Sequence, residues 1–376
     1  MLIGIDGNEA NIESRVGVNQ YAYGLLCSIH KLQEGNDNNI RVIVYLKENA
    51  LPDLPKETKN FKYKTLRGGK VWVITRLMSH LFLTREKPDV FFSPSHYLPP
   101  FLPMPMVCAI MDLGYLKFSG QFNKTAFWQL KYWTAISILV SKHIIAISKR
   151  TKEDIVRHYP FASRKITVTH LAYDKNKFNT KVSQRDVRRV QKKYSIIYDY
   201  VLFLSTLKPS KNVEGLLEAW KRVSSSFGNM KLVIAGKKGW LYESIFEKVK
   251  ELGLSKNVVF TGFVDEKDKP ALIKGARVFV LPSFWEGFGL DPLYAMASGV
   301  ATVVSKEGSL PEVVGDAGVL VNPYEPESIA QGLEKVLSMD ENEYNKIVEV
   351  GLKQAKKFSW EKTAQKTLEV LKEVSK

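Results

Sequence analysis

The sequence of 376 residues contains only two cysteines, Cys27 and Cys108, which lie far apart and form no C-x-x-C spacing. This count argues against a disulfide framework and against a thiolate zinc site, and it fits a reducing compartment. The six histidines show no metal-ligand spacing, and no Asp-x-Asp occurs. A divalent metal is therefore not implied by the residue pattern.

Long apolar runs are also missing. A membrane-spanning helix needs about 18 or more mostly uncharged apolar residues, and the nearest candidate, Ala126–Val140, is interrupted by Lys131. The N-terminus lacks a basic segment followed by an apolar one, so no signal peptide is expected. These two absences predict a cytoplasmic protein without a membrane span.

Acidic residues are under-represented, because 55 Lys and Arg face 39 Asp and Glu, for a formal net charge of +16. Such a balance suits anionic lipid headgroups, nucleic acid or phosphate-bearing substrates. The basic residues are dispersed along the chain, which fits equally well with lysines that serve solubility. Charge alone leaves these alternatives open.

Apolar strands that alternate with helices are present in both halves of the chain. This order predicts an α/β protein with two parallel sheets, each covered by helices on both faces. We expect an N-terminal domain at residues 1–180, a C-terminal domain at 195–355, a last helix at 356–376 and a linker at Asp174–Tyr194. The expected strands are Leu2–Ile5, Ile40–Tyr45, Val90–Phe92, Met106–Ile110, His143–Ile147, Ile166–His170, Tyr200–Leu204, Lys231–Ala235, Val258–Thr261, Ala276–Leu281 and Gly318–Val321.

The stretch Leu281–Val304 combines a strand end, a glycine-containing turn and a helix that is expected to begin near Pro292. Unpaired amides and the dipole at a helix N-terminus attract anions, and glycines let a phosphate approach the backbone. The turn carries a single acid, Glu286. The stretch therefore predicts a phosphate-bearing ligand with a polar group held by Glu286.

A second loop with phosphate-binding chemistry is Ser205–Asn212, between a buried strand and a helix. Lys208 and Lys211 could neutralise a phosphate there, and Asn212 could cap the helix. The alternative is a solvated basic turn. Because two such loops occur in one half of the chain, we favour the binding role.

Other loops that follow strands hold weaker candidates. Gly236 could approach a ligand, and the backbone at Val264 could meet a base edge or merely turn the chain. Asp112 could hold a sugar hydroxyl or cap the next segment. Gly17 could cover a ligand, or Asn19 could cap the helix, and His96 is expected to be structural.

The segment Phe118–Val140 mixes aromatic residues with Lys124 and Lys131. Such a segment can lie in a membrane interface. The commoner explanation is a helix packed over the first sheet.

Taken in order, the motifs resemble bacterial family 4 glycosyltransferases of the retaining, group 1 type, which have the GT-B fold. The resemblance covers nearly the whole chain and implies two doubly wound Rossmann-like domains that face each other across a cleft, with the last helix crossing back to the first domain. The stretches that carry it are IGIDGNEAN…GVNQYAYGLL, LSTLKPSKNVEGLLEAW, LVIAGKKGW, FTGFV, LPSFWEGFGLDPLYAMASGV, SLPEVVGDAGVLV and FSWEKTAQKTLEVL.

The resemblance also implies roles for individual residues. Glu286 would contact hydroxyls of a donor sugar, and Lys211 would neutralise the departing diphosphate; together with Asp112 they are the candidate catalytic residues. The remaining candidates would bind the donor: the amides of Phe288, Gly289 and Leu290 at the diphosphate, the backbone of Val264 at the nucleobase, Gly17 in a closing loop, and Thr206, Lys208, Gly236 and Tyr294 around them.

The activity implied by the resemblance is the retaining, metal-independent transfer of a hexose of mannose or glucose type from a nucleotide-diphosphate sugar to a glycan or a lipid-linked acceptor. Lys211 and helix amides can stabilise the leaving group without a metal. No cofactor and no nucleic-acid partner are expected. The protein would be cytoplasmic, serve cell-envelope polysaccharide synthesis and contact the anionic inner face of the membrane.

Three positions depart from the family pattern. Tyr294 replaces a second glutamate that would bind the ribose, Met111 replaces a histidine, and Ser210 replaces an arginine. Asp291 or the Tyr294 hydroxyl could compensate. The departures also leave an alternative, a degenerate GT-B protein with a binding or partner-subunit role and little catalysis.

Overall fold

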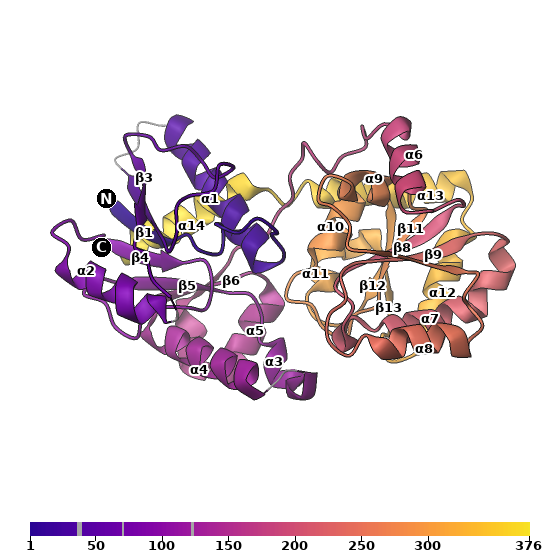
Figure 1. The fold of residues 1–376 in the computed structure, drawn as a ribbon, viewed down its shortest axis with the longest axis horizontal. Coiled ribbons are helices and arrows are strands. Elements are labelled where there is room, and N and C mark those ends of the chain that lie inside the picture. The colour runs from indigo at the N-terminus through magenta and orange to yellow at the C-terminus, as the bar shows by residue number, and fades with distance from the viewer. Residues whose placement is uncertain (36–39, 70, 122–123) are drawn as a thin grey trace. The chain divides into compact units, whose positions relative to one another are not determined.

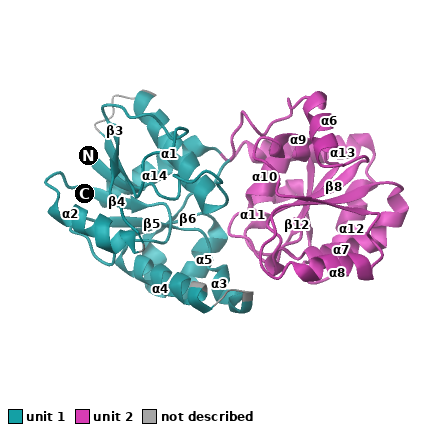
Figure 2. Cartoon of the chain, viewed as in Figure 1, with its two compact units in different colours: residues 1–172, 359–376 teal, residues 173–358 magenta. Residues whose placement is uncertain are grey.

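Two units, each built on its own parallel sheet, make up the part of the chain described by the computed structural model, which covers residues 1–35, 40–69, 71–121 and 124–376. Unit 1 comprises Met1–Ala172 and Ser359–Lys376, and unit 2 comprises Tyr173–Phe358 (Figure 1 and Figure 2). The chain therefore leaves unit 1 near residue 172 and returns to it near residue 359.

The sheet of unit 1 has seven strands in the order β3-β2-β1-β4-β5-β6-β7, and the pairs are parallel. Its central strands are continuous apolar runs because helices cover both faces of the sheet. β1 and β5, for example, are buried along their whole length. The strands are β1 (Leu2–Asp6), β2 (Arg41–Leu46), β3 (Phe61–Thr65), β4 (Val90–Ser93), β5 (Met106–Ile110), β6 (His143–Ala146) and β7 (Ile166–Val168).

Helices cover both faces of this sheet. Figure 1 shows α1 and α14 on one face and α2, α4 and α5 on the other, as right-handed crossovers require. The helical segments are α1 (Val18–Gly35), η1 (Val73–Met78), α2 (Ser79–Leu83), α3 (Gly114–Lys117), η2 (Ser119–Gln121), α4 (Lys124–Val140), α5 (Lys149–His158), η3 (Pro160–Lys165) and α14 (Trp360–Val374). The expected helical stretch Phe118–Val140 corresponds to η2 and α4, and residues 122–123 within it lie outside the described residues.

The last helix, α14, belongs to unit 1, although it follows unit 2 in the sequence. Ser359 caps its N-terminus by accepting a hydrogen bond from the amide of Lys362. The hydroxyl of Thr363 donates to the carbonyl oxygen of His170 over 2.6 Å. A Cβ atom on Gly24 of α1 would lie 2.4 Å from the Trp360 ring, so the glycine lets the two helices pack closely.

The sheet of unit 2 has six strands in the order β10-β9-β8-β11-β12-β13, again paired in parallel. This order reverses direction between β8 and β11, which is where open α/β sheets bind ligands at the carboxyl ends of their strands. The strands are β8 (Tyr200–Leu204), β9 (Lys231–Ala235), β10 (Val258–Gly262), β11 (Val278–Leu281), β12 (Ala301–Ser305) and β13 (Gly318–Val321).

The helices of unit 2 also lie on two faces. α7, α8 and α12 cover one, and α9, α10, α11 and α13 cover the other (Figure 1). The segments are α6 (Gln184–Lys193), η4 (Pro209–Lys211), α7 (Val213–Val223), η5 (Ser224–Phe227), α8 (Glu243–Glu251), α9 (Lys269–Lys274), α10 (Leu290–Ala297), α11 (Leu310–Val314), η6 (Gly315–Ala317), α12 (Pro326–Leu337) and α13 (Glu341–Ala355). Within the described ranges, no helix is both long enough and apolar enough to cross a membrane.

The expected linker Asp174–Tyr194 is wrong, because this segment is part of unit 2 and contains α6. α6 is mostly charged, but Val187 and Val190 are buried, and the Arg189 guanidinium donates to Asp268 over 2.9 Å. Lys193 also donates to Asp268, over 2.6 Å. The segment is therefore held by two apolar side chains and a buried carboxylate rather than by a long apolar face.

Candidate functional site

Glu286 and Lys211 meet at the carboxyl edge of the unit 2 sheet. The Lys211 ammonium donates to Oε1 of Glu286, and the Ser283 hydroxyl donates to the same oxygen over 2.8 Å. Both charged side chains are largely withdrawn from solvent. The loop after β8 and the turn after β11 therefore place one cation and one carboxylate side by side, as expected if both serve one ligand.

The turn that holds Glu286 is supported by the loop after β12. The Ser309 hydroxyl lies 2.9 Å from the carbonyl oxygen of Glu286 and 2.8 Å from that of Phe288. Gly308 has φ +67°, and a Cβ there would lie 2.8 Å from backbone atoms of Glu286. Sequence reasoning missed this support, although Gly308 and Ser309 stand directly before a proline-containing helix start.

Gly289 forms the junction between this turn and α10, which begins at Leu290, two residues before Pro292. Its φ is +100°, a backbone conformation that side chains strongly disfavour, and a Cβ would lie 2.5 Å from the buried Leu310 side chain. As the N-cap residue it offers no side chain to the first amides of the helix. The family resemblance implies that the amides of Phe288, Gly289 and Leu290 bind a diphosphate at this helix start, and this role stays a prediction.

Two loops, after β8 and after β9, pair through their backbones. The amide of Leu207 donates to Lys237 over 3.0 Å, and the amide of Gly239 donates to Leu207 over 2.9 Å. A Cβ on Gly236, where φ is +146°, would lie 1.8 Å from the carbonyl oxygen of Ser205. Gly236 is therefore required for this pairing, and half-buried Thr206 lies within it.

Lys208 and Asn212 occupy the ends of the loop that carries Lys211. The Lys208 ammonium lies 5.2 Å from the centre of the Trp240 ring, a cation–π distance. The expected helix cap by Asn212 is wrong: the residue is left-handed, at φ 55°, and its side chain makes no cap hydrogen bond. The Asn212 amide group instead donates to the carbonyl oxygens of Pro282 (3.2 Å) and Pro323 (2.6 Å), which ties three loops together.

Tyr294, where the family pattern has a second glutamate, stacks on Phe178 with ring centres 4.0 Å apart and planes 3° apart. Both side chains are buried. Burial raises the pKa of the Tyr294 hydroxyl well above its usual value, and the charge of Asp291 acts in the same direction. The hydroxyl therefore stays protonated and can act as a hydrogen-bond donor.

Asp291 lies in the first turn of α10. Burial raises its pKa to about 6, and the charges of Glu286 and Glu266 also raise it, whereas those of Lys269 and Lys211 lower it. The region around Lys211 is thus a cluster of carboxylates and ammonium groups rather than a purely basic pocket.

Val264 follows β10 and is buried, so its side chain is part of the core. Gly262, two residues before it at the end of β10, has φ +67° and accepts a hydrogen bond at its carbonyl oxygen from the amide of Gly236 over 2.9 Å. The glycine that follows β9 is therefore bonded to the glycine that ends β10. The role of the Val264 backbone at a nucleobase stays a prediction.

The two candidates in unit 1 lie in separate loops. Gly17, at φ +50°, directly precedes α1, and a Cβ there would meet open space. Asn19 does not cap α1, because it lies within the first turn of the helix; its side-chain oxygen accepts from the amide of Val16 over 3.4 Å, and its amide group donates to the Glu9 carboxylate over 2.7 Å. Asp112 caps the next segment by accepting from the amide of Gly114 over 2.8 Å, which was one of its two expected roles.

Met111 and His96 both lie in loops that follow strands of unit 1, Met111 after β5 and His96 after β4. The carbonyl oxygen of Met111 accepts a hydrogen bond from the Thr151 hydroxyl over 3.1 Å. Burial lowers the pKa of His96 to about 4, so this imidazole is neutral at physiological pH. Its carbonyl oxygen accepts from Ser137 over 2.5 Å, which ties the loop after β4 to α4.

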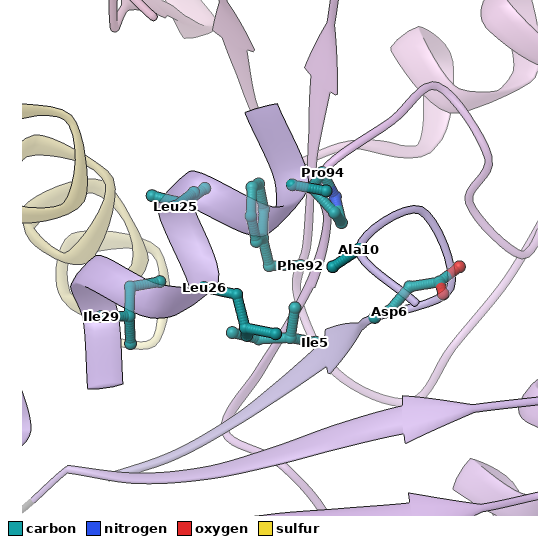
Figure 3. Close-up of a pocket in the computed structure, with 10 residues that line it drawn as sticks. Ile5, Asp6, Ala10, Leu25, Leu26, Ile29, Phe92 and Pro94 are labelled. Carbon is teal, nitrogen blue, oxygen red and sulfur yellow. The ribbon is translucent and has the colours of Figure 1, made fainter. Parts of the chain in front are cut away.

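A small cavity of about 10 Å³ lies between β1, α1 and the end of β4 (Figure 3). Its lining is apolar apart from Asp6, whose carboxylate accepts from the side chain of Asn8 over 2.6 Å. Figure 3 shows the Asp6 oxygens pointing away from Leu25, Leu26 and Ile29. A space of this size without polar partners is a packing gap rather than a ligand site.

Comparison with known proteins bears on the activity of the chain. A family model described as "Glycosyl transferases group 1" matches residues 187–354. O-antigen chain mannosyltransferase B of Escherichia coli is 30% identical over 289 residues, which cover 76% of this chain and 74% of that protein. The chain belongs to the group 1 glycosyltransferases.

Two further matches extend this result. The serotype-specific mannosyltransferase WbdA of Escherichia coli is 33% identical over 229 residues, covering 60% of this chain but only 28% of that protein. The crystal structure of HepE from Anabaena in complex with UDP and glucose superposes with a TM-score of 0.72 and 18% identity, covering 99% of each chain. The glycosyltransferase described here therefore has the GT-B fold.

Membership of the group 1 glycosyltransferases identifies the enzyme class, whereas the roles of single residues stay predictions. In unit 2 the structure brings Lys211, Glu286 and the start of α10 together, with Gly236 and Thr206 in adjoining loops. Within the described ranges, no group of three or more His, Cys, Asp and Glu side chains is arranged to hold a metal ion.

Proposed function

We propose that this glycosyltransferase moves a hexose of mannose or glucose type from a nucleotide-diphosphate sugar, with retention of the anomeric configuration and without a metal. The observation that carries the proposal is the pairing of Lys211 with Glu286 beside the start of α10. A cation and a helix start suit a diphosphate, and a carboxylate suits sugar hydroxyls. The mannosyltransferases among the relatives support the mannose class.

In the proposed reaction the bond between the anomeric carbon and the diphosphate oxygen breaks, and a bond to the acceptor oxygen forms on the same face of the sugar. The departing phosphate oxygen takes the proton of the acceptor hydroxyl. Lys211 and the amides at the start of α10 stabilise the negative charge that develops on the diphosphate. When the donor binds, before the transfer, Glu286 exchanges its bond to Lys211 for bonds to hydroxyls of the donor sugar.

We assign recognition of the donor ribose to the stacked side chains of Tyr294 and Phe178. The Tyr294 hydroxyl remains protonated. A neutral hydrogen-bonding group therefore stands where the family pattern has a carboxylate. An intact pair of Lys211 and Glu286, together with relatives named as transferases, gives no support to a degenerate, non-catalytic protein.

The acceptor is proposed to be a glycan or a lipid-linked saccharide bound by unit 1 on the cytoplasmic side of the membrane. An open hollow of about 410 Å³ lies at the ends of β2 and β3 and is lined by Lys47, Glu48, Asn49, Arg67 and Gly68. Ligand pockets are typically about 300–1,000 Å³. Its mixture of cations, a carboxylate and an amide suits a polar saccharide that carries an anionic group.

The test is donor hydrolysis and transfer with UDP-, GDP- and ADP-linked mannose and glucose, with and without EDTA. We expect one nucleotide sugar to be turned over in EDTA, with a product of the same anomeric configuration by NMR. Lys211→Ala should lower kcat about 100-fold or more because it removes a stabilising charge from the leaving group. Glu286→Ala should act similarly, and Lys221→Ala on α7 is the control.

Absence of turnover with every donor, or equal turnover by wild type and Glu286→Ala, would contradict the proposed donor site. Loss of turnover in EDTA that Mg²⁺ restores would contradict metal independence alone. An inverted product would contradict retention alone.

A further inference from the structure

The carboxylate of Glu286 receives two hydrogen bonds at the same oxygen. The Lys211 ammonium and the Ser283 hydroxyl both donate to Oε1, the hydroxyl over 2.8 Å. The second oxygen, Oε2, accepts no hydrogen bond from any residue that the structure describes. Because a carboxylate can accept about four hydrogen bonds, Oε2 is the oxygen that this arrangement leaves to a ligand.

The two partners of Glu286 differ in how freely they can move. The Lys211 ammonium ends a long, flexible stem, and in the proposed reaction it stabilises the charge on the diphosphate. The Ser283 side chain is fully buried and short, so its hydroxyl stays close to the main chain. Ser283 can therefore remain bonded to Glu286 while Lys211 turns to the ligand.

The backbone on both sides of Ser283 is bonded to the loop after β8. The carbonyl oxygen of Pro282 accepts from the side-chain amide of Asn212 over 3.2 Å. The amide of Phe284 donates to the carbonyl oxygen of Ser210 over 2.9 Å. Ser283 thus lies between two long-range hydrogen bonds, which fix the main chain from which its hydroxyl reaches Glu286.

A second buried serine supports the same turn in a different way. The Ser309 hydroxyl lies 2.9 Å from the carbonyl oxygen of Glu286 and 2.8 Å from that of Phe288, and the Ser309 amide donates to the former over 3.2 Å. These contacts are to the main chain, whereas the Ser283 hydroxyl bonds to the carboxylate. Ser309 therefore shapes the turn, and Ser283 orients the side chain that the turn carries.

We propose that Ser283 is a positioning residue for glycosyl transfer. It holds Oε1 of Glu286, so that Oε2 meets hydroxyls of the donor sugar after Lys211 has turned to the diphosphate. This role rests on the proposed function, because it needs Glu286 to bind the donor sugar. Without the Ser283 hydroxyl, the carboxylate would be ordered only when the sugar binds, at a cost in affinity.

The experiment is isothermal titration calorimetry of the full chain with GDP-mannose and GDP, and with UDP-glucose and UDP as a second pair. The pair that the wild type binds is used for the variants. Ser283→Ala should raise the Kd for the nucleotide sugar about tenfold, because a hydrogen bond to a charged group is lost. The Kd for the nucleoside diphosphate should change less than about twofold, since that ligand has no sugar for Glu286 to bind.

Ser309→Ala is the comparison for a change in the turn itself. It should weaken the nucleotide sugar and the nucleoside diphosphate to a similar degree, because the amides of the turn move with its main chain. Ser298→Ala is the matched control: Ser298 at the end of α10 is also fully buried, but its hydroxyl makes no hydrogen bond within the described ranges. It should bind both ligands like the wild type, and unchanged thermal melting should show that each variant is folded.

A double variant tests whether Ser283 acts through Glu286. Glu286→Ala alone should weaken the nucleotide sugar about tenfold or more. Ser283→Ala added to it should weaken binding by less than about a further twofold, because the partner of the hydroxyl is gone. A further loss as large as in the wild-type background would overturn the positioning role. Equal losses of nucleotide sugar and nucleoside diphosphate in Ser283→Ala would also overturn it.

The same titrations separate this role from the proposed function. If Glu286→Ala binds the nucleotide sugar like the wild type, the proposed donor site is wrong, and the role of Ser283 falls with it. If Glu286→Ala binds weakly while Ser283→Ala binds like the wild type, the donor site stands and only the role of Ser283 is wrong.

Discussion

The carboxyl group of Asp291 lies in the first turn of α10, within reach of the charges of Lys211, Lys269, Glu286 and Glu266. Burial raises the pKa of this carboxyl to about 6, against about 3.9 in an unfolded chain. Folding therefore opposes ionisation of Asp291. The resulting loss in the free energy of unfolding is absent at a pH below the pKa that Asp291 has in the unfolded chain. The loss grows as the pH rises from about 4 to 6 and is constant above pH 6.

Asp291→Asn should for this reason stabilise unit 2 at pH 8 by about 1–3 kcal/mol, since each unit of pKa shift corresponds to about 1.4 kcal/mol. The gain should vanish near pH 4. Urea unfolding at pH 4, 6 and 8 measures it, with exposed Asp316→Asn as the control. A gain that is the same at all three pH values would show that the charge of Asp291 is not its cause.

Single residues also show where sequence reasoning reaches its limit. Glu286 and Lys211 were each singled out from the chemistry of their own loops, but 75 positions separate them and their ion pair depends on how β8 and β11 pack. Asn212 failed as a cap because two distant carbonyl groups, of Pro282 and Pro323, take its hydrogen bonds. Such long-range contacts leave no local pattern in a single sequence.

At the scale of elements, the paired loops after β8 and β9 depend on Gly236. Gly236→Ala would place a Cβ 1.8 Å from the carbonyl oxygen of Ser205, and a backbone group cannot rotate away as a side chain would. We expect a loss of stability on the order of 3 kcal/mol or more, together with weaker donor binding.

Gly253→Ala is the matched control for that change, because Gly253 has φ +66° and a Cβ there meets open space. It should cost only the strain of a left-handed backbone, about 1–2 kcal/mol. Chemical unfolding and donor titration of both variants give the comparison. Equal losses would mean that the contact with Ser205 has no part in the effect.

Element prediction succeeded where the fold imposes a repeated pattern. Central strands such as β5 and β8 are buried along their length, so their apolar runs predict them well. β3 was missed because it is an edge strand whose residues alternate, with Lys62 and Lys64 exposed. α6 was missed because only two of its side chains, Val187 and Val190, are buried.

At the scale of the whole molecule, α14 completes unit 1. Its buried face includes Ala364, Thr367, Leu368 and Leu371, and it packs against α1. A chain that stops after Phe358 should lose the cooperative unfolding of unit 1, because this apolar face and its contacts are removed. Unit 2 should retain its own transition.

Differential scanning calorimetry measures this outcome. A chain that stops after Val374 is the control and should melt like the full chain, since it keeps the whole of α14. If the chain that stops after Phe358 kept both transitions unchanged, α14 would be dispensable for unit 1.

The chain passes from unit 1 to unit 2 and back again, and this path sets the order in which the two units are completed during synthesis. Unit 2 is one continuous segment, Tyr173–Phe358, whereas unit 1 needs residues from both sides of it. During synthesis, unit 2 can thus emerge and fold while unit 1 still lacks α14 and leaves part of α1 uncovered. Nascent chains of this enzyme should depend most on chaperones in that interval, because the exposed apolar surface of unit 1 persists until α14 emerges.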